Sequence, residues 1–438
     1  MSIEIITLLM FGGLAFLLLT GIPIGFATGG IAVLATLFLW GPSSVFVIAN
    51  RAYNWMSSPA LVAIPLFIFM AQMLSHSGAI DDLFDAVYIW AGPIKGGLAI
   101  MTVLGATLMA AMSGIVGATE VTMGLVALPA MMKRKYNKHL ALGCIAAGGS
   151  LGYLIPPSII FVLYGLAADQ SVGKLFMGGF GPGLLLAFLY IVYIIILAYV
   201  KPDTAPALPR EERQAVSLNV KIGMTKFLFF PALLIFSVLG SIYMGIATIT
   251  ESAGIGAAGA ILVALFHRRL NWSTVQDSCY MTIRVSSMIL WLVIGSSAFI
   301  SVYTAVGGTE FAKSLISSLP FGRWGTMIIM QMILIFLGCF IDWAGILTLT
   351  TPIFLPIIIG MGFDPIWYGV LFNVNMQISC LSPPFGPALF YLRGIAPPNV
   401  SMLDIYKSSV PFVAIQVLVL ALCMIFPQII TFLPSLVN

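Results

Sequence analysis

The sequence predicts an all-α polytopic membrane protein with inverted repeats, two re-entrant helical hairpins and two helices broken at adjacent prolines. Composition is the first observation: of 438 residues, 60% are hydrophobic and 8% are charged, and the mean hydropathy is +1.09. A soluble domain carries about 25% charged residues. The second observation is a proline motif that recurs at one spacing, and the third is the placement of helix-breaking residues inside apolar stretches. Together they indicate a chain that crosses a bilayer many times.

The charged residues and cysteines argue against several other classes of protein. The net charge of +4 is small and spread over loops, so nucleic-acid binding is not expected. The five cysteines lie far apart without a CxxC pair, which argues against disulfides and a metal cluster. The hydrophobic start of the chain has Glu4 in place of a basic region and lacks a small-residue cleavage site. It therefore predicts a membrane segment rather than a signal peptide.

The recurring motif divides the chain into two similar halves. Pro129 and Pro156 are 27 positions apart, as are Pro356 and Pro383, so an offset of 227 relates the two Pro-Pro pairs (383 − 156). A long polar stretch lies between the halves. We predict a first repeat at residues 1–200, a cytoplasmic linker at 201–226 and a second repeat at 227–438.

Basic residues give each segment its predicted direction. Clusters at Lys133–Lys138, in the linker and at His267–Arg269 are placed in the cytoplasm by the positive-inside rule. Because about 20 residues span a bilayer, the second half then runs opposite to the first. Predicted crossings are Ile3–Trp40 (two, turning near Gly21), Ala60–Leu74, Leu140–Leu166, Phe176–Val200, Phe227–Phe266 (two, turning near Gly245), Met288–Val306, Ile366–Gly394 and Phe412–Phe432. Hairpins that enter and leave on one side are predicted at 97–132 and 326–361.

Shorter stretches between the crossings have their own patterns. Ser77–Trp90, Asn271–Arg284 and Gly308–Leu319 mix charged and apolar residues, which predicts helices lying flat at the membrane interface, with plain loops as the alternative. The stretch around Arg51 carries a single charge and is predicted to be an external loop.

Each hairpin is followed by a crossing that is interrupted at its Pro-Pro pair, at Gly152–Pro157 and at Ser379–Pro384. Proline removes a backbone donor and keeps the preceding residue out of helical geometry, so nearby carbonyl groups lose their helical partners. Irregular backbone at membrane depth must be buried in protein or line a wet cavity. We therefore expect these carbonyl oxygens, helped by the hydroxyls of Ser113, Ser379 and Ser382, to bind a cation such as Na⁺. The half-helices that restart after the breaks direct positive N-termini at the same region, which suits an anionic substrate.

Polar residues inside the apolar segments are candidates for contact with that substrate. Asp342 lies in a hydrophobic run at the tip of the second hairpin, and an acid inside the membrane is costly and usually functional. Asn373 and Asn375 precede the second break, where they would hydrogen-bond substrate or a hairpin. The substrate-binding candidates are Thr119, Glu120, Ser158, Asp342, Asn373 and Asn375. For any single Gly or Ser in these regions, tight helix packing is the competing explanation.

Two other functions have weaker support. The stretch GGSLG around Ser150 matches the nucleophile-elbow pattern of hydrolases, but that pattern requires a strand–turn–helix context, and here the context is an apolar helix. A channel is also possible from the apolar segments, but inverted repeats with paired broken helices favour alternating access.

Several motifs resemble those of a known family. The stretches MAAMSGIVGAT, AAGGSLGYLIPPSIIFVLYG, FLGCFIDWAGILTLTTPIFLPI and SPPFGPALFYLRG are similar to the large membrane subunit (M subunit, DctM-like) of TRAP (tripartite ATP-independent periplasmic) transporters. The likeness covers essentially the whole chain, and the two Pro-Pro blocks are specific to it.

The resemblance implies an elevator-type transporter of the ion transporter superfamily, in which a mobile domain carries substrate past a static scaffold. It implies scaffold helices within 1–59, 174–200 and 227–270, arm and transport elements within 60–170 and 271–395, and a terminal helix at 408–434. It also implies coupling Na⁺ ions, without an organic cofactor. The implied ligands are Ser113, Gly114, Gly152, Ile155 and Pro157 at one site, and Gly338, Ser379, Ser382 and Pro384 at the other.

The resemblance also implies partners and a location. A small four-helix membrane subunit and a periplasmic substrate-binding protein that delivers an organic acid are expected, in the inner membrane of a bacterium. SPPFGPALFYLRG looks closest to members that handle small carboxylates such as 2-oxo or hydroxy acids, and Glu120 is less usual at its position. The expected function is Na⁺-coupled uptake of such an acid or of a dicarboxylate, without enzymatic activity. The alternatives are a stand-alone ion-coupled carboxylate carrier of related architecture and, more remotely, an intramembrane serine hydrolase at Ser150.

Overall fold

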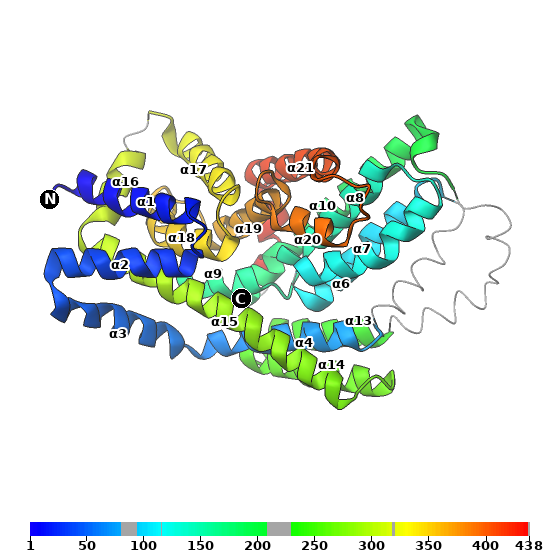
Figure 1. Ribbon diagram of the computed structural model, residues 1–438, viewed down its shortest axis with the longest axis horizontal. Helices are drawn as coiled ribbons and strands as arrows, with labels where there is room; N and C mark the ends of the chain where they lie inside the picture. Colours follow the sequence, from blue (N-terminus) through cyan, green and yellow to red (C-terminus); the bar gives the residue numbers. More distant parts are fainter. Residues whose placement is uncertain (80–93, 115, 208–228, 318–319, 437–438) are drawn as a thin grey trace.

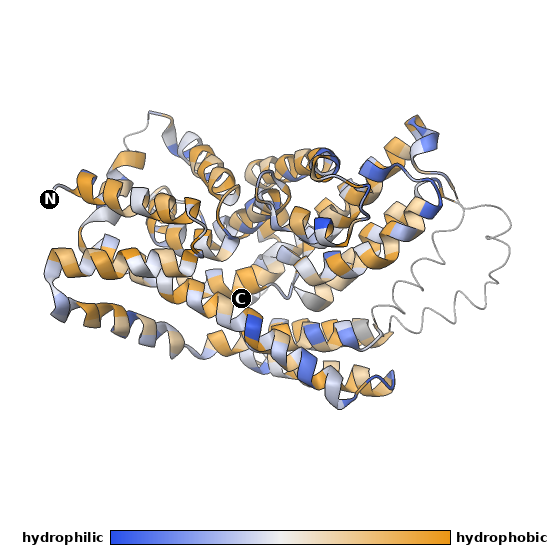
Figure 2. Ribbon diagram, in the orientation of Figure 1, coloured by the Kyte–Doolittle hydropathy of each residue, from blue (hydrophilic) through white to orange (hydrophobic). Residues whose placement is uncertain are grey.

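The described part of the chain consists of helices and loops, without strands, as the sequence predicts. The computed structural model describes residues 1–79, 94–114, 116–207, 229–317 and 320–436 (Figure 1). Among these residues, six helices are long and apolar enough to cross a membrane, judged by length and composition. Figure 2 shows apolar residues along most helices, and large side chains such as Leu19, Phe38 and Phe236 are exposed on them. The chain is a multi-pass membrane protein.

The first half contains the helices up to residue 207. They are α1 (Ile3–Leu19), α2 (Ile24–Trp40), α3 (Val45–Met56), α4 (Ala63–His76), α6 (Gly97–Ser113), α7 (Val116–Lys133), α8 (Lys138–Ser150), α9 (Ile159–Ala168) and α10 (Val172–Val200). Short 3₁₀ turns lie between them at η1 (Pro42–Ser44), η2 (Pro59–Val62) and η3 (Leu151–Tyr153), with η4 (Pro202–Thr204) at the end.

The second half repeats this order after residue 228. Its helices are α13 (Phe229–Tyr243), α14 (Ile249–Phe266), α15 (Trp272–Ala305), α16 (Gly308–Ser317), α17 (Gly322–Gly338), α18 (Trp343–Gly360), α19 (Pro365–Leu381), α20 (Pro387–Ile395), α21 (Met402–Ile425) and α22 (Gln428–Thr431), followed by η6 (Pro434–Leu436). Adding 227 to the bounds of α7 gives those of α18, and the same offset relates the first residues of α8 and α19. The helices therefore recur at the spacing that the prolines predict.

Both predicted reversals lie where they were expected. The chain turns between α1 and α2 at Thr20–Pro23, and between α13 and α14 at Met244–Thr248. In each case the two helices contact one another. Pairs of helices in contact also lie at the positions of the two predicted hairpins, α6 with α7 and α17 with α18.

The prediction of a separate interfacial helix at Asn271–Arg284 before a crossing at Met288–Val306 is wrong. Both segments belong to α15, a continuous helix of 34 residues. A change from polar to apolar side chains does not interrupt a helix, and neither Gly nor Pro occurs between Trp272 and Ile294. At 1.5 Å per residue α15 is about 50 Å long, which exceeds the roughly 30 Å hydrocarbon core.

The predicted external loop around Arg51 is also wrong, because these residues form α3, a helix without a fully buried residue. The prediction of a helix at Gly308–Leu319 is confirmed over Gly308–Ser317. Most of the predicted interfacial stretch Ser77–Trp90 and most of the predicted linker 201–226 lie outside the described residues.

The broken helices form the centre of the molecule. Every residue from Leu140 to Ser150 in α8 and from Trp367 to Leu381 in α19 is buried. The hairpin α6–α7 packs on α8, α17 packs on α19, and α21 contacts both broken helices. Figure 1 places α1, α2 and α3 toward one end and α6, α7 and α8 toward the other, with α15 running obliquely past α2 and α4.

Candidate functional site

The first break separates α8 from α9 and is buried throughout, from Leu151 to Ser158. The Leu151 carbonyl accepts bonds from the Leu154 and Ile155 amides, and the Tyr153 carbonyl accepts one from the Ser158 hydroxyl at 2.5 Å. The carbonyls of Gly152, Ile155, Pro156 and Pro157 accept no hydrogen bond from the described residues. Three of these four, the carbonyls of Gly152, Ile155 and Pro157, are ones that the family resemblance implies as Na⁺ ligands.

The end of the first hairpin closes over this break. Gly114 follows α6 with φ +59°, in the left-handed region that favours glycine. A Cβ atom on Gly114 would lie 2.1 Å from the carbonyl oxygen of Pro157, so the close approach requires glycine. Gly114 and Pro157, which are 43 positions apart in the chain, therefore meet. Ser113 is the last residue of α6, and its side chain lies outside the described part.

The second break separates α19 from α20 and contains two hydroxyl groups. The Ser379 hydroxyl donates to the Asn375 carbonyl at 3.3 Å, and the Ser382 hydroxyl donates to the Ile378 carbonyl at 2.6 Å. Because each hydroxyl hydrogen is used within the helix, the oxygen lone pairs remain free to face a cation. The carbonyl of Pro384, another predicted ligand, is already occupied, because it accepts a hydrogen bond from the Tyr406 hydroxyl at 3.1 Å.

The second hairpin contacts this break through Gly338, the last residue of α17. A Cβ atom on Gly338 would lie 1.9 Å from Ser379 Oγ, so these two predicted ligands touch. A small cavity at the same place is lined by residues of the hairpin tip, of both breaks and of α20, among them Tyr153, Gly338, Asp342, Ser379 and Pro387. The two breaks and the second hairpin thus share one region of the molecule.

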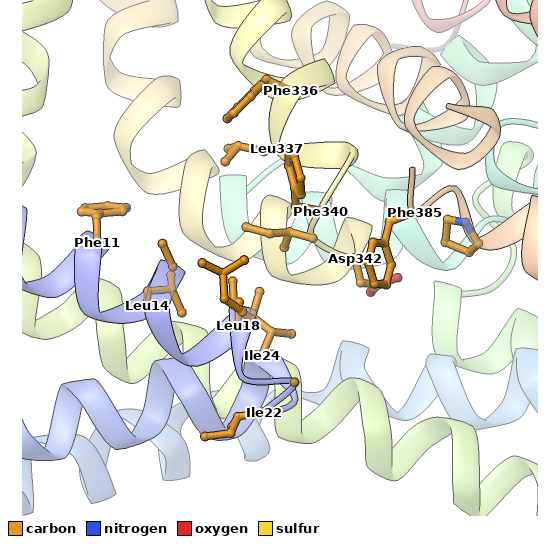
Figure 3. Close-up of a pocket in the computed structure, with 15 residues that line it drawn as sticks. Phe11, Leu14, Leu18, Ile22, Ile24, Phe336, Leu337, Phe340, Asp342 and Phe385 are labelled. Atoms are coloured by element: carbon orange, nitrogen blue, oxygen red, sulfur yellow. The ribbon is translucent and has the colours of Figure 1, made fainter. Parts of the chain in front are cut away.

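Asp342 begins α18 and has two kinds of surroundings. Its carboxylate accepts a bond from the Ala344 amide at 3.1 Å, which caps the helix. It also lines a crevice of about 630 Å³ between the α1–α2 turn, the end of α17 and the start of α20. Figure 3 shows Asp342 near Phe385 at one end of the crevice, with side chains of α1 and α2 across from it.

The crevice is apolar apart from Asp342. Its walls include Phe11, Leu14 and Leu18 from α1, and Phe336 and Phe340 from the second hairpin. Sequence reasoning missed the α1 wall. After Glu4 and Thr7 near its start, this helix is apolar on all sides, so its pattern does not mark which side faces the crevice.

Comparison with known proteins identifies the family. Residues 11–429 match the family model described as the tripartite ATP-independent periplasmic transporter, DctM component. The chain belongs to this family. It is 31% identical over 407 residues to the C4-dicarboxylate TRAP transporter large permease protein DctM of Pseudomonas aeruginosa, covering 93% of each chain. It is 30% identical to the protein of the same name from Vibrio cholerae, covering 100% of this chain and 98% of that one.

Two further similarities extend the comparison. The isethionate TRAP transporter permease protein DctMQ of Oleidesulfovibrio alaskensis is 30% identical, over 96% of this chain and 65% of that protein. The fold resembles that of the YdaH transporter of Alcanivorax borkumensis, with a TM-score of 0.62 at 13% identity over 90% of this chain and 91% of the other. The chain is therefore a TRAP transporter large permease, and it shares its fold with the YdaH protein.

The remaining substrate candidates of this DctM component do not line the crevice. Asn375 donates to the backbone and side-chain carbonyls of Gln331 on α17, at 2.9 and 2.8 Å, so it bonds to the hairpin, one of the two outcomes expected for it. Thr119, Glu120 and Asn373 are fully buried within the helices. Neither amide atom of Asn373 has a partner in the described part of the chain.

Ser150 does not have the surroundings of a hydrolase nucleophile. It is the last residue of α8 and fully buried, whereas a nucleophile elbow lies on an exposed strand-to-helix turn. Its hydroxyl donates to the Ala147 carbonyl at 2.8 Å and accepts a bond from Gln416 Nε2 at 3.3 Å. The relatives of this DctM component are named as transporter permeases, not as hydrolases.

Proposed function

We propose that this permease couples uptake of a small organic acid to Na⁺. The observation that carries the proposal is the pair of broken helices, each closed by a glycine of one hairpin. Gly114 lies over a buried break with carbonyl oxygens that accept no hydrogen bond in the described structure. Gly338 lies against the Ser379 hydroxyl at the other break. Oxygen-lined, unwound backbone of this kind is where secondary transporters bind Na⁺.

The residues present fit a hard cation. The carbonyls of Gly152, Ile155 and Pro157 would serve the first site together with Ser113 and Gly114. Gly338, Ser379 and Ser382 would serve the second, and Pro384 would contribute there after its bond from Tyr406 is released. A bound Na⁺ would supply positive charge at membrane depth, next to the region where the anion is expected.

The half-helices support binding of the anion. The first turn of α9 after one break, and of α20 after the other, leaves amide groups without intrahelical acceptors. The positive ends of these helices favour a carboxylate or sulfonate. Relatives are named for C4-dicarboxylates and for isethionate, which are small anions. We propose a small carboxylate as substrate, such as a dicarboxylate or a 2-oxo or hydroxy acid.

The mechanism we propose is elevator-type alternating access between inverted repeats. The recurrence of helix bounds at an offset of 227 supports the two repeats. When the two repeats are placed in opposite orientations across the membrane, each hairpin enters and leaves on one side. The crevice between α1–α2 and the second hairpin would be the boundary between scaffold and moving domain. Because its walls are almost wholly apolar, sliding along it breaks few hydrogen bonds.

The family resemblance supports the rest of the assembly. We propose that the chain works in the bacterial inner membrane with a small four-helix membrane subunit and a periplasmic substrate-binding protein. Uptake by vesicles that contain this chain alone would instead favour a stand-alone carrier.

A thermal-stability measurement in Na⁺ tests cation binding without knowledge of the substrate. The purified chain should unfold at a higher temperature in Na⁺ than in choline, because a bound ion stabilises the folded state. The double variant Ser379→Ala and Ser382→Ala should lose the part of this difference that comes from the second site. Ser408→Ala is the matched control, because its buried hydroxyl also donates to a backbone carbonyl, of Ile405, but lies outside both breaks. Equal Na⁺ stabilisation of the wild type and the double variant would remove the second site from the proposal.

A further inference from the structure

Glu120 is a buried acid that the proposed cation sites do not use. It lies on α7 with no exposed surface. Neither carboxyl oxygen has a hydrogen-bond partner, and no ion pair involves it, among the described residues. An ionised carboxylate without water, donor or cation is strongly disfavoured, whereas the neutral acid tolerates such a place. The geometry therefore corresponds to Glu120 with a proton bound.

The carboxyl group is pressed against the end of α8. A Cβ atom on Gly149 would lie 2.1 Å from Glu120 Cγ and 3.1 Å from Oε1, so the acid occupies the space that this glycine leaves. Gly149 lies three positions before Gly152, whose carbonyl is one of those in the first break that accept no hydrogen bond in the described structure. Separation of α7 and α8 at this contact would open the carboxyl group to water.

The groups that face Glu120 supply no positive charge. Cys380 on α19 and Tyr391 on α20 interact with it electrostatically, and both are neutral in their usual form. Tyr391 lies over Gly117, one turn earlier on α7, where a Cβ atom would lie 3.0 Å from its ring. The nearby 3₁₀ turn η3 contributes Tyr153, which faces Cys380.

The charged residues of the packed helices lie elsewhere. Helix α6 has no titratable side chain. The basic residues of α7 and α8, Lys133, Lys138 and His139, are at the ends away from Glu120. Cys144 of α8 donates its thiol hydrogen to the Ala141 carbonyl. Arg393 of α20 donates to the Val400 carbonyl.

We infer that Glu120 is a proton-binding site that titrates during the transport cycle, and this inference rests on the proposed transport function. When hairpin α6–α7 moves away from α8, water reaches the carboxyl group and the O–H bond breaks, leaving a carboxylate and a hydronium ion. When the hairpin closes, a hydronium ion returns a proton to the carboxylate. Gly114, on the same hairpin, closes the first cation site against Pro157. The same movement therefore governs the proton and the cation, and each affects binding of the other.

Infrared spectroscopy of the purified chain tests whether the proton is bound, independently of transport. The spectrum at neutral pH should contain the carbonyl stretch of a protonated carboxyl group, and Glu120→Gln should remove it. Glu310→Gln is the matched control, because Glu310 is an exposed acid on α16. Identical protonated-carboxyl bands in wild type and Glu120→Gln would overturn the inference.

Uptake measured against pH tests whether the proton takes part in the cycle. Proteoliposomes with the full assembly, constant Na⁺ and a labelled C4-dicarboxylate should take up substrate more slowly as the pH rises from about 6 to 8.5. The change should approach tenfold per pH unit at most, because a single proton is involved. Glu120→Gln should give a flat profile, while Glu120→Asp and Glu310→Gln should keep the slope.

The outcomes separate this inference from the proposed function. A wild-type pH profile in Glu120→Gln would overturn the coupled proton, even where uptake itself is normal. A substrate that binds through a cationic group at Glu120 would instead lose affinity equally at all pH values in Glu120→Gln, which also contradicts the inference. Absence of uptake by the wild type would count against the proposed function, and the infrared result would still decide whether Glu120 binds a proton.

Discussion

At the scale of single residues, two glycines decide how closely each hairpin approaches its break. Gly114 contacts the Pro157 carbonyl and Gly338 contacts the Ser379 hydroxyl, and neither place has room for a methyl group. In the proposed cation sites, tight packing and ion binding would use the same small residues, so the packing explanation is compatible with the proposal.

Gly338→Ala should disturb the second site. The added methyl group would lie 1.9 Å from Ser379 Oγ, so the hairpin or the serine must move, at a cost of about 1–3 kcal/mol. We expect a lower unfolding temperature and a weaker Na⁺ response. Gly360→Ala at the other end of the same hairpin is the control, because nothing lies within 4 Å of its added Cβ. Equal effects of the two substitutions would show that the contact with Ser379 is unimportant.

Asp342→Asn separates the two roles of Asp342. Asparagine caps a helix about as well as aspartate, so the stability of α18 should change by less than about 0.5 kcal/mol. The charge in the crevice is removed, and we expect uptake to fall several-fold. Asp364→Asn is the control, because Asp364 also caps a helix, accepting from the Ile366 amide at 2.7 Å, but lies away from the crevice. Normal uptake by Asp342→Asn would leave Asp342 with a structural role alone.

The sequence predicts backbone features of the site better than side-chain partners. Proline pairs and glycines act on their own backbone, so Pro156, Pro157 and Gly114 could be placed without knowing the packing. Asn375 has several possible acceptors, and only the packing of α19 on α17 selects Gln331. The α1 wall of the crevice could not be predicted for the same reason, since a uniformly apolar helix has no distinctive side.

At the scale of elements, α15 and its counterpart in the first half differ. The offset of 227 relates the start of α15 at Trp272 to the start of α3 at Val45, yet the first half has two helices, α3 and α4, where the second has one. The interruption contains Ser57, Ser58 and Pro59, and the offset places Ser286 opposite Pro59. The single proline Pro59 thus accounts for the interruption between α3 and α4. The change from polar to apolar residues within Asn271–Val306 does not interrupt α15.

Ser286→Pro should recreate this interruption in α15. Proline in the interior of a helix removes one backbone hydrogen bond and clashes with the previous turn, at a cost of about 3 kcal/mol or more. We expect a lower unfolding temperature and reduced uptake. Ser273→Pro in the first turn of α15 is the control, because proline is tolerated there. Similar losses in both variants would indicate that the substitutions act through something other than the middle of the helix.

At the scale of the whole molecule, residues from both halves of the chain meet in one region. Each half supplies a hairpin, a broken helix and a long helix that follows it, α10 in one and α21 in the other. Because α8 and α19 are buried at the centre, the two breaks meet there, and Tyr153 of one lines a cavity with Ser379 of the other. Neither half would enclose the site alone.

The last prediction concerns movement along the crevice. Leu18 on α1 and Phe340 on the second hairpin line opposite walls, so cysteines at both positions joined by a short bifunctional reagent should hold the walls together. The experiment requires a background without Cys144, Cys279, Cys339, Cys380 and Cys423. If the hairpin domain slides past α1 during transport, the cross-link should stop uptake, and a reducible reagent should restore it on cleavage. A pair at Phe336 and Phe340 is the control, because the centroids of these two rings lie 5.4 Å apart within one hairpin and should move together. Full uptake with the Leu18–Phe340 link intact would mean that the two walls stay fixed, and the elevator would then have to be abandoned for a mechanism in which only the hairpin tips open.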